Sequence, residues 1–133
     1  MDLDKLPIGH SLPATERKVT QQMVLTYLNA VGDHSPVYES GEWVPPTALS
    51  ALTVRFMLET MGLPPGTLHA SQEIKICRPV TTNSKILYEV KVAQNTIRQP
   101  WRFLVLDVMA REKGGPTLML SRCTLLVPMV NNQ

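Results

Sequence analysis

The chain has 133 residues, of which 44% are hydrophobic and 18% charged, and its formal net charge is +2. This length predicts a single domain over residues 1–133, large enough to close a core without disulfides or metals. The small net charge gives no reason to expect a nucleic-acid partner. No apolar stretch approaches the roughly 20 residues of a membrane span, and the first residues lack the pattern of a secretion signal. We therefore expect a cytoplasmic protein with neither a membrane nor a nucleic-acid partner.

The two cysteines, Cys77 and Cys123, lie in strand-like segments without the spacing of metal ligands. We expect both to be buried free thiols, with a disulfide between them as the alternative. His10 and His69 have no ligand partners at metal spacing, so surface positions are expected for both. The sequence thus predicts neither a metal nor a cofactor.

The first part of the chain predicts a lead-in, a short strand and one helix. Residues 2–13 contain two prolines and little periodicity, which indicates a surface segment, and residues 14–19 fit a short edge strand. Thr20 is a suitable N-cap for the helix, and Gly32 marks its end. Apolar residues recur between them at i, i+3, i+4 and i+7: Val24, Tyr27, Leu28 and Val31.

A long apolar segment, residues 44–61, is the centre of the predicted fold. Pro45 and Pro46 fit the first turn of a helix, and Gly62 ends it. Apolar residues point in nearly every direction at the helical period, so we expect a helix that is buried on most sides. Small hydroxyl residues in it should bond to their own backbone carbonyls. They are Thr47, Ser50, Thr53 and Thr60.

Beyond Gly66 the apolar period changes from 3.6 to 2, which predicts antiparallel strands. We expect strands at residues 68–79, 86–92, 101–111 and 118–127, and turns at 81–84, 95–100 and 112–116. Parts of the last two strands are apolar on both faces, so we expect the helix on one face and a second subunit on the other. A sheet that curls around one buried helix is an α+β plan, the architecture called the hotdog fold.

The segment YLNAVGDHSPVY at residues 27–38, which covers the end of the first helix and the turn after it, resembles the hydratase signature of the MaoC-like family. That signature has Gly-Asp, one residue, Asn-Pro, one residue and a catalytic His. Three positions match: Gly32, Asp33 and Pro36. Ser35 stands at the Asn position and Tyr38 at the His position. The segment EIKICRPV, at residues 73–80, resembles the family's second motif, and the resemblance covers nearly the whole chain.

The resemblance implies a hotdog protein that hydrates 2-enoyl thioesters of coenzyme A or acyl carrier protein with (R)-specificity, or dehydrates the 3-hydroxyacyl products. In the family an Asp and a His share the catalytic water, and Asp33 could keep its part. Tyr38 is a poor base because an unperturbed phenol titrates near ~10. Two ways of catalysing the reaction without the family His remain open. Either His34 supplies an imidazole, or Asp33 is the sole base and the Tyr38 hydroxyl donates a hydrogen bond to the water or the substrate.

Candidate substrate contacts lie at the start of the apolar helix. Backbone N–H groups of Thr47 and Ala48 would favour negative charge on a thioester oxygen, and the resemblance implies an oxyanion hole there. Ser35 and Arg55 are further candidates.

Charged side chains leave alternatives open. Arg55 needs a partner, either Asp33 or Glu59, which lies one turn later. Four cations could meet a coenzyme A phosphate or be ordinary exposed strand charges. They are Lys85, Lys91, Arg98 and Arg102.

Three functions remain possible from the sequence. The first is an acyl-thioester-binding protein with hydratase or dehydratase activity. The second is a non-catalytic subunit that shapes the acyl tunnel for an active partner, and the third is a hotdog thioesterase that uses Glu59. Hotdog relatives pair their sheets, so we expect a homodimer or a heterodimer with a sister subunit.

Overall fold

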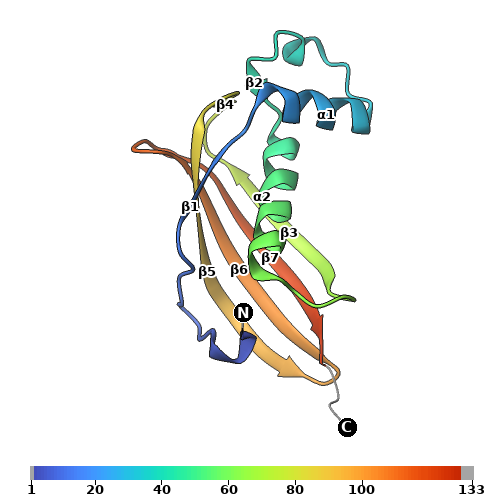
Figure 1. The fold of residues 1–133 in the computed structure, drawn as a ribbon, viewed down its shortest axis with the longest axis vertical. Coiled ribbons are helices and arrows are strands. Elements are labelled where there is room, and N and C mark those ends of the chain that lie inside the picture. Colours follow the sequence, from blue (N-terminus) through green and yellow to red (C-terminus); the bar gives the residue numbers. More distant parts are fainter. Residues whose placement is uncertain (1, 130–133) are drawn as a thin grey trace.

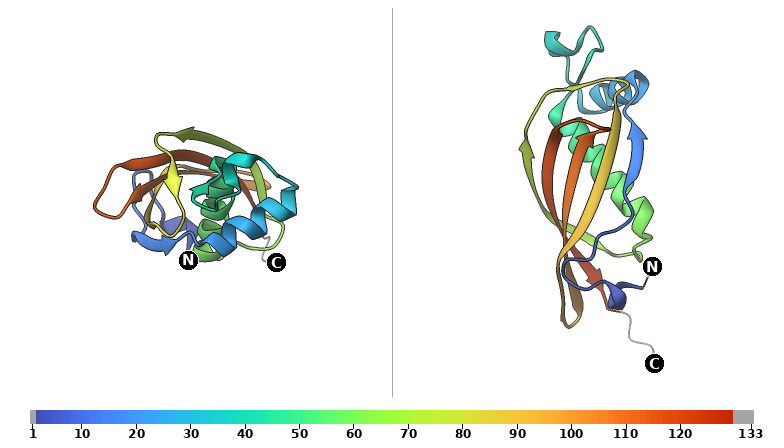
Figure 2. Two further views of the ribbon diagram at one scale, coloured as in Figure 1. Left: turned by 90° about the horizontal axis from the view of Figure 1, so that it is seen from above. Right: turned by 90° about the vertical axis from the view of Figure 1, so that its left-hand side faces the viewer.

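The computed structural model describes residues 2–129. A five-stranded antiparallel sheet in the order β1-β5-β6-β7-β3 curls around the long helix α2 (Figure 1). Its strands are β1 (Thr15–Lys18), β5 (Lys85–Arg98), β6 (Trp101–Glu112), β7 (Thr117–Pro128) and β3 (Leu68–Ile76). Seen from above, the sheet is a curved wall with α2 on its concave side (Figure 2). The predicted plan of a sheet around a helix is confirmed.

Smaller elements gather near the start of α2. They are helix α1 (Gln21–Val31), the 3-10 turn η2 (Pro36–Tyr38), and the two-stranded sheet of β2 (Trp43–Val44) and β4 (Val80–Thr81). Thr20 caps α1 as predicted, since its hydroxyl accepts a hydrogen bond from Met23 N at 3.2 Å. Gly32 ends α1 with a φ of 69°, in the left-handed region that glycine adopts without strain.

Helix α2 (Pro46–Met61) packs one face into the core and leaves another open. Its fully buried residues include Leu49, Met57 and Met61, and burying each large side chain stabilises the fold by roughly 1.5–3 kcal/mol. The expectation of burial on most sides is wrong, because the sheet covers only part of the helix circumference. An exposed stripe runs along α2 at a spacing of four residues: Thr47, Ala51, Arg55 and Glu59.

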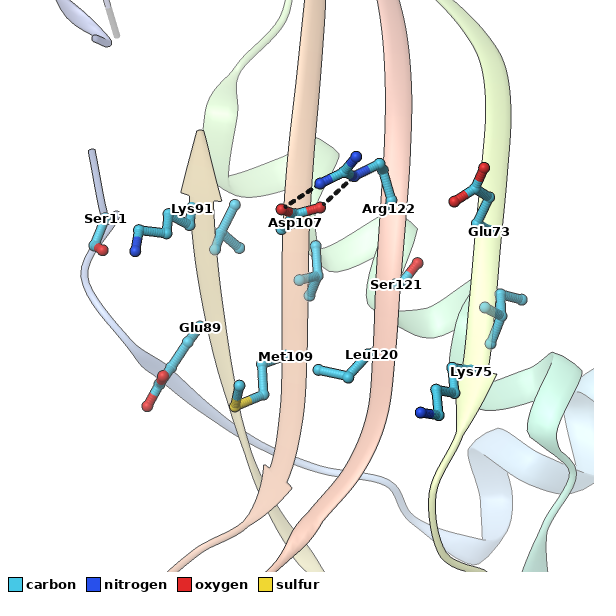
Figure 3. A pocket seen from close by; sticks show the side chains of 13 residues that line it. Ser11, Glu73, Lys75, Glu89, Lys91, Asp107, Met109, Leu120, Ser121 and Arg122 are labelled. Atoms are coloured by element: carbon cyan, nitrogen blue, oxygen red, sulfur yellow. Dashed lines mark hydrogen bonds and ion pairs between the residues drawn. The ribbon is translucent and has the colours of Figure 1, made fainter. Parts of the chain in front are cut away.

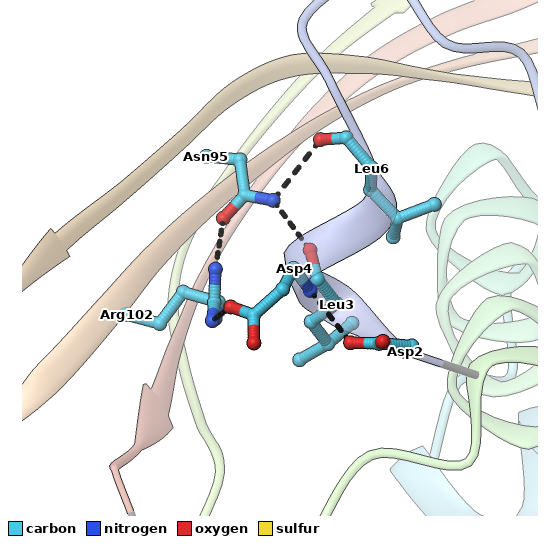
Figure 4. A network of polar contacts seen from close by, with 6 residues as sticks. All are labelled: Asp2, Leu3, Asp4, Leu6, Asn95 and Arg102. Carbon is cyan, nitrogen blue, oxygen red and sulfur yellow. Dashed lines mark hydrogen bonds and ion pairs between the residues drawn. The ribbon is translucent and has the colours of Figure 1, made fainter.

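Strand β5 continues through part of the segment that was expected to turn, residues 95–100. The polar residue Asn95 fits within the strand because its side chain holds the N-terminal segment. Asn95 Nδ2 donates to the carbonyl oxygens of Leu3 at 2.8 Å and Leu6 at 3.0 Å (Figure 4). The turn is therefore confined to the residues between β5 and β6, where the Gln99-Pro100 peptide is cis.

The N-terminal segment lies mostly at the surface, as expected from its prolines, but Leu6 and Leu12 are buried and attach it to the sheet. It forms the 3-10 turn η1 (Leu3–Lys5), and Leu6 is 5% exposed. The Arg102 guanidinium is buried here; it donates to Asn95 Oδ1 at 2.8 Å and pairs with the carboxylate of Asp4 (Figure 4). Arg102 is thus neither an exposed strand charge nor accessible to a coenzyme A phosphate.

Strand β3 lies at an edge of the sheet, and most of its side chains are exposed. A bulge between His69 and Ser71 interrupts the alternation, so Leu68 faces away from the side occupied by Ile74. The expectation that the apolar residues of this strand share one half-buried face is therefore wrong. Leu68 is 50% exposed and Ile74 is 44% exposed, which leaves an apolar sheet edge uncovered in the single chain.

Both cysteines are free thiols, as predicted, but only Cys123 is buried. Cys77 is exposed just beyond the end of β3, so the expectation of two buried thiols is wrong for this residue.

Candidate functional site

The turn after α1 is held together by Asp33. Asp33 N donates to Leu28 O at 3.0 Å, and Asp33 Oδ1 accepts a hydrogen bond from Ser35 N at 2.9 Å. Ser35 O in turn accepts from Tyr38 N at 3.0 Å, which closes η2. The carboxylate therefore has a local structural role in addition to any chemical one.

The hydrogen bond from the Ser35 backbone lowers the pKa of the Asp33 carboxyl, so this group is ionised at neutral pH. His34 is exposed beside it. Within residues 2–129, no hydrogen bond joins the Asp33 carboxylate to the side chain of His34 or Tyr38. The structure therefore places the three expected catalytic residues in one turn, without an acid–imidazole pair of the family type.

Tyr38 lines a hollow of ≈510 Å³ between the turn η2, the start of α2 and the end of β3. The lining is mainly apolar and comes from distant parts of the chain: Val37, Tyr38, Trp43, Val44, Pro46, Ile76, Cys77, Arg78, Pro79 and Val80. Tyr38 is half-buried, and no residue of the described chain forms a hydrogen bond with its hydroxyl. A half-buried phenol with a free hydroxyl can orient a polar group of a ligand, but it does not replace an imidazole as a base.

The start of α2 has unused backbone donors. Pro46 has no N–H, and Leu49 N already donates to Pro45 O at 3.0 Å. Among residues 2–129, the amides of Thr47 and Ala48 have no acceptor. The first turn of a helix favours negative charge, so these two amides suit the developing charge of a thioester oxygen.

A groove of ≈570 Å³ runs between the exposed stripe of α2 and strand β3. Its lining mixes polar and apolar side chains: Thr47, Ser50, Ala51, Val54, Arg55, Leu58, Glu59, His69 and Gln72. Arg55 Nε pairs with Glu59 Oε1 at 3.1 Å, which decides between the two expected partners in favour of Glu59 over Asp33. Both side chains stay largely exposed at the rim.

The expected site residues are thus divided between two neighbouring hollows. Tyr38 lies in the apolar hollow, whereas Thr47 and Arg55 lie in the groove. Asp33, His34 and Ser35 line neither of them. The Ala48 side chain is fully buried, so this residue offers its backbone alone.

Two contributions to these hollows could not be predicted from the sequence. Gln72 and Ser50 meet across the groove, and Nε2 of Gln72 lies 2.6 Å from Ser50 Oγ. These residues are 22 positions apart, and the polar residue at each position fits an ordinary helix or strand surface. Trp43 belongs to a two-residue strand that periodicity cannot reveal.

A third hollow, of ≈650 Å³, lies on the opposite face of the sheet from α2 (Figure 3). A row of alternating charges crosses four neighbouring strands there: Lys91, Asp107, Arg122 and Glu73. Arg122 donates to both carboxylate oxygens of Asp107, at 2.7 and 3.0 Å, and lowers the pKa of this carboxyl. None of the seven residues expected at the functional site contributes to this hollow.

Within the described residues, no group of His, Cys, Asp and Glu is arranged to hold a metal ion. Neither helix of residues 2–129 has the length and apolar character that crossing a bilayer requires.

Comparisons with known proteins place this geometry in a structural class. No family model matches the sequence, and no curated protein matches it. Solved structures do match over nearly the whole chain. The R-hydratase PhaJ1 of Pseudomonas aeruginosa has 16% identity and a TM-score of 0.77, covering 96% of this chain and 86% of its own.

Two further matches are of the same kind. The MaoC-like dehydratase of Rhodospirillum rubrum has 16% identity and a TM-score of 0.73, with 98% of both chains covered. The HadBC complex of Mycobacterium tuberculosis, a 3R-hydroxyacyl-ACP dehydratase, has 17% identity and a TM-score of 0.73, with coverage of 90% and 96%. This protein therefore has the hotdog fold. The predicted resemblance to MaoC-like dehydratases and (R)-hydratases is confirmed at the level of the fold.

Proposed function

We propose that this protein binds the acyl group of coenzyme A or acyl-carrier thioesters, as a subunit of a hydratase or dehydratase assembly. The observation that carries the proposal is the α2–β3 groove, which begins at Thr47, where the two free amides lie. A thioester oxygen at these amides would leave the acyl chain to follow the groove past Val54 and Leu58. From Thr47 to Glu59 the groove follows α2 for about 18 Å, at 1.5 Å of helix per residue.

Catalysis in this proposal belongs mainly to a partner subunit. The hydration of a 2-enoyl thioester requires a base for water and a proton for the α-carbon. Here Asp33 is tied into its own turn, and Tyr38 occupies the position of the family imidazole. A sister chain with an intact Asp and His would supply what this chain lacks.

The uncovered edge strand supports the presence of such a partner. The free edge of β3 presents backbone donors and acceptors, together with the exposed apolar residues Leu68, Ile74 and Ile76. A second hotdog subunit that pairs with β3 would continue the sheet and cover the α2–β3 groove. The matched HadBC structure is a complex by its name, and it supports this arrangement by analogy. The proposal places the protein in cytoplasmic acyl-thioester metabolism.

A second candidate function is hydration by this chain itself, favoured by the ionised and accessible Asp33 carboxylate. In this version Asp33 takes a proton from water as the water oxygen adds to C3, and the Asp33 carboxyl then gives this proton to C2. Negative charge would pass through the thioester oxygen beside the Thr47 and Ala48 amides. The Tyr38 hydroxyl would orient the water or the substrate.

The thioesterase alternative has less support from the geometry. Glu59 lies in the last turn of α2 and is paired with Arg55, about 18 Å along the helix from the free amides. A carboxylate at this distance does not reach a thioester carbonyl that is bound at the helix start.

The test measures binding and turnover separately. Crotonyl-CoA, a longer 2-enoyl-CoA and the corresponding acyl-carrier thioesters are added to the purified protein and to Asp33→Asn and Tyr38→Phe, and loss of enoyl-thioester absorbance is followed. The proposal expects thermal stabilisation by the thioesters without turnover, and turnover when the catalytic sister chain is added. Turnover by this chain alone that disappears in Asp33→Asn would establish the second candidate. Absence of binding to both coenzyme A and acyl-carrier thioesters would overturn the proposal, and release of free thiol would indicate a thioesterase.

A further inference from the structure

A buried polar cluster lies at the base of the α2–β3 groove. Gln72 Nε2, on β3, donates to Ser50 Oγ on α2 at 2.6 Å and to Ser121 Oγ on β7 at 3.4 Å. Ser50 is 5% exposed and Ser121 is 6% exposed, whereas Gln72 is half-buried and lines the groove. We call these three residues the serine–glutamine cluster.

Ser50 differs from Thr53 and Thr60, two other small hydroxyl residues of α2. Thr53 Oγ1 donates to Leu49 O at 2.6 Å and Thr60 Oγ1 donates to Phe56 O at 2.9 Å, as expected for hydroxyls inside a helix. The same expectation is wrong for Ser50, whose side chain bonds across the groove to Gln72. The Ser50 hydroxyl accepts a hydrogen bond from Gln72 and keeps its own hydrogen for a ligand, whereas the Thr53 and Thr60 hydroxyls donate theirs to the helix backbone.

The cluster has hydrogen-bonding capacity left over. The hydroxyl hydrogens of Ser50 and Ser121 and the side-chain oxygen of Gln72 have no partner among residues 2–129. A serine hydroxyl can donate one hydrogen bond while it accepts others, and an amide oxygen accepts up to two. An alkyl chain lying on these groups would leave them unpaired and away from water, which is unfavourable. A ligand hydroxyl in the groove would satisfy the Ser50 hydroxyl and the Gln72 oxygen, because it can accept one hydrogen bond and donate another.

The charges near the cluster indicate that the ligand oxygen is neutral. Arg55 is the groove's guanidinium, and its charge is balanced by Glu59 at 3.1 Å. A ligand carboxylate would have to compete with Glu59 for Arg55. A ligand hydroxyl is neutral, accepts from a serine hydroxyl and donates to the Gln72 oxygen.

We infer that this groove selects acyl chains with a hydroxyl group several carbons beyond the thioester, and that Gln72 is a specificity-determining residue. The inference rests on the function proposed above. Ser50 lies three residues beyond Thr47, about 4.5 Å along the helix axis, which places the cluster beside the acyl chain and beyond the reacting carbons.

The experiment compares two saturated thioesters that cannot be hydrated, hexanoyl-phosphopantetheine and 6-hydroxyhexanoyl-phosphopantetheine. Both carry the arm that coenzyme A and acyl carrier proteins share. Dissociation constants are measured by ligand-observed NMR for the native protein, Gln72→Leu and Ser50→Ala. Gln94→Leu is the matched control, because Gln94 is also half-buried on the sheet but lies outside the groove. Thermal unfolding shows which variants are folded.

For the native protein we expect the hydroxylated thioester to bind about tenfold more tightly, which is the effect of one or two satisfied hydrogen bonds. Gln72→Leu should bring the ratio to about one, partly by improving the binding of the hexanoyl thioester, and Gln94→Leu should keep the native ratio. Ser50→Ala should reduce the ratio as well, and it serves as the test if Gln72→Leu is unfolded. Equal binding of both thioesters to the native protein would overturn the inference while leaving the proposed function intact. Binding of neither would overturn the proposed function itself.

Discussion

Asp33 Oδ1 lies 2.9 Å from the backbone nitrogen of Ser35, so the expected catalytic acid also holds the turn that contains it. The hydrogen bond explains why the pKa of Asp33 is lowered, because the donor stabilises the ionised carboxylate. It also means that a loss of activity in an Asp33 variant has two possible causes, a missing base or a distorted turn.

Asp33→Asn and Asp33→Ala should separate these causes. Asparagine keeps an oxygen that accepts from Ser35 N but lacks the negative charge, so at pH 7 Asp33→Asn should melt slightly below the native protein. Alanine removes the acceptor and should melt lower. An Asp33→Asn protein that melts as low as Asp33→Ala would show that the charge, and not the acceptor, holds the turn.

The difference in stability between the native protein and Asp33→Asn should depend on pH, and the lowered pKa of Asp33 determines the direction. A carboxyl whose pKa is lowered on folding stabilises the folded state above its ordinary value of 3.8, and the stabilisation is lost as the pH falls. The difference in melting temperature between the native protein and Asp33→Asn should therefore be largest near pH 7 and shrink below pH 4. A difference that grows with acidity would contradict the lowered pKa.

Arg102 should be a point of high sensitivity in the fold. Its guanidinium is 7% exposed and connects Asp4 with Asn95, which itself holds Leu3 and Leu6. Arg102→Ala should lower the free energy of unfolding by about 2 kcal/mol, because it leaves Asn95 Oδ1 without its donor and removes the packing of a buried side chain.

Urea denaturation provides the measurement, with Lys91→Ala as the control. Lys91 is an exposed cation on the outer face of β5, and its removal should change the free energy of unfolding by less than about 0.5 kcal/mol. Equal effects of the two substitutions would mean that the N-terminal segment is not anchored through Arg102.

The central elements of the fold could be predicted from the sequence because each is specified locally. Thr20 and Gly32 mark the ends of α1, and the change of period after Gly66 indicates the strands. The burial of Arg102 could not be predicted, because its partner Asp4 is 98 residues away. The bulge near Ala70 was hidden for a similar reason, since it depends on pairing with β7 and not on the strand itself.

The candidate site was predicted less completely than the fold. The motif located the turn at Asp33, yet neither hollow includes that residue. The open stripe along α2 was missed because an all-round apolar pattern cannot show how far a sheet extends around a helix. Gln72 was missed because its role depends on a hydrogen bond to Ser50, which lies on another element.

The two thiols should differ strongly in reactivity. Cys123 is 1% exposed and burial raises its pKa to about 11, whereas Cys77 is exposed. At pH 8 the thiolate fraction of Cys123 is about 0.1%, so a thiol-specific reagent should modify one cysteine quickly and the second after unfolding. Cys77→Ser should remove the fast phase. Two fast thiols in the native protein would mean that the region around Cys123 opens readily.

The exposed edge of β3 should mediate association with a second hotdog chain. When no sister chain is present, we expect the protein to associate with another copy of itself through this edge. Ile76 is 39% exposed on this strand, and a lysine there would place a charge at the point of pairing. Sedimentation velocity of the purified protein should show a dimer, and Ile76→Lys should shift it to the monomer. The Ile76 side chain is already partly exposed, so its replacement does not disturb the packing of the core. Any fall in the melting temperature of the monomeric variant should therefore come from the loss of association.

Ile97→Lys is the matched control for the edge. Ile97 is 47% exposed, lies on β5 and is separated from β3 by two strands of the sheet. Its substitution should leave the dimer intact, since the charge is introduced far from the free edge. If Ile97→Lys dissociates the dimer and Ile76→Lys does not, the subunits associate through a surface other than β3. The partner would then not cover the α2–β3 groove.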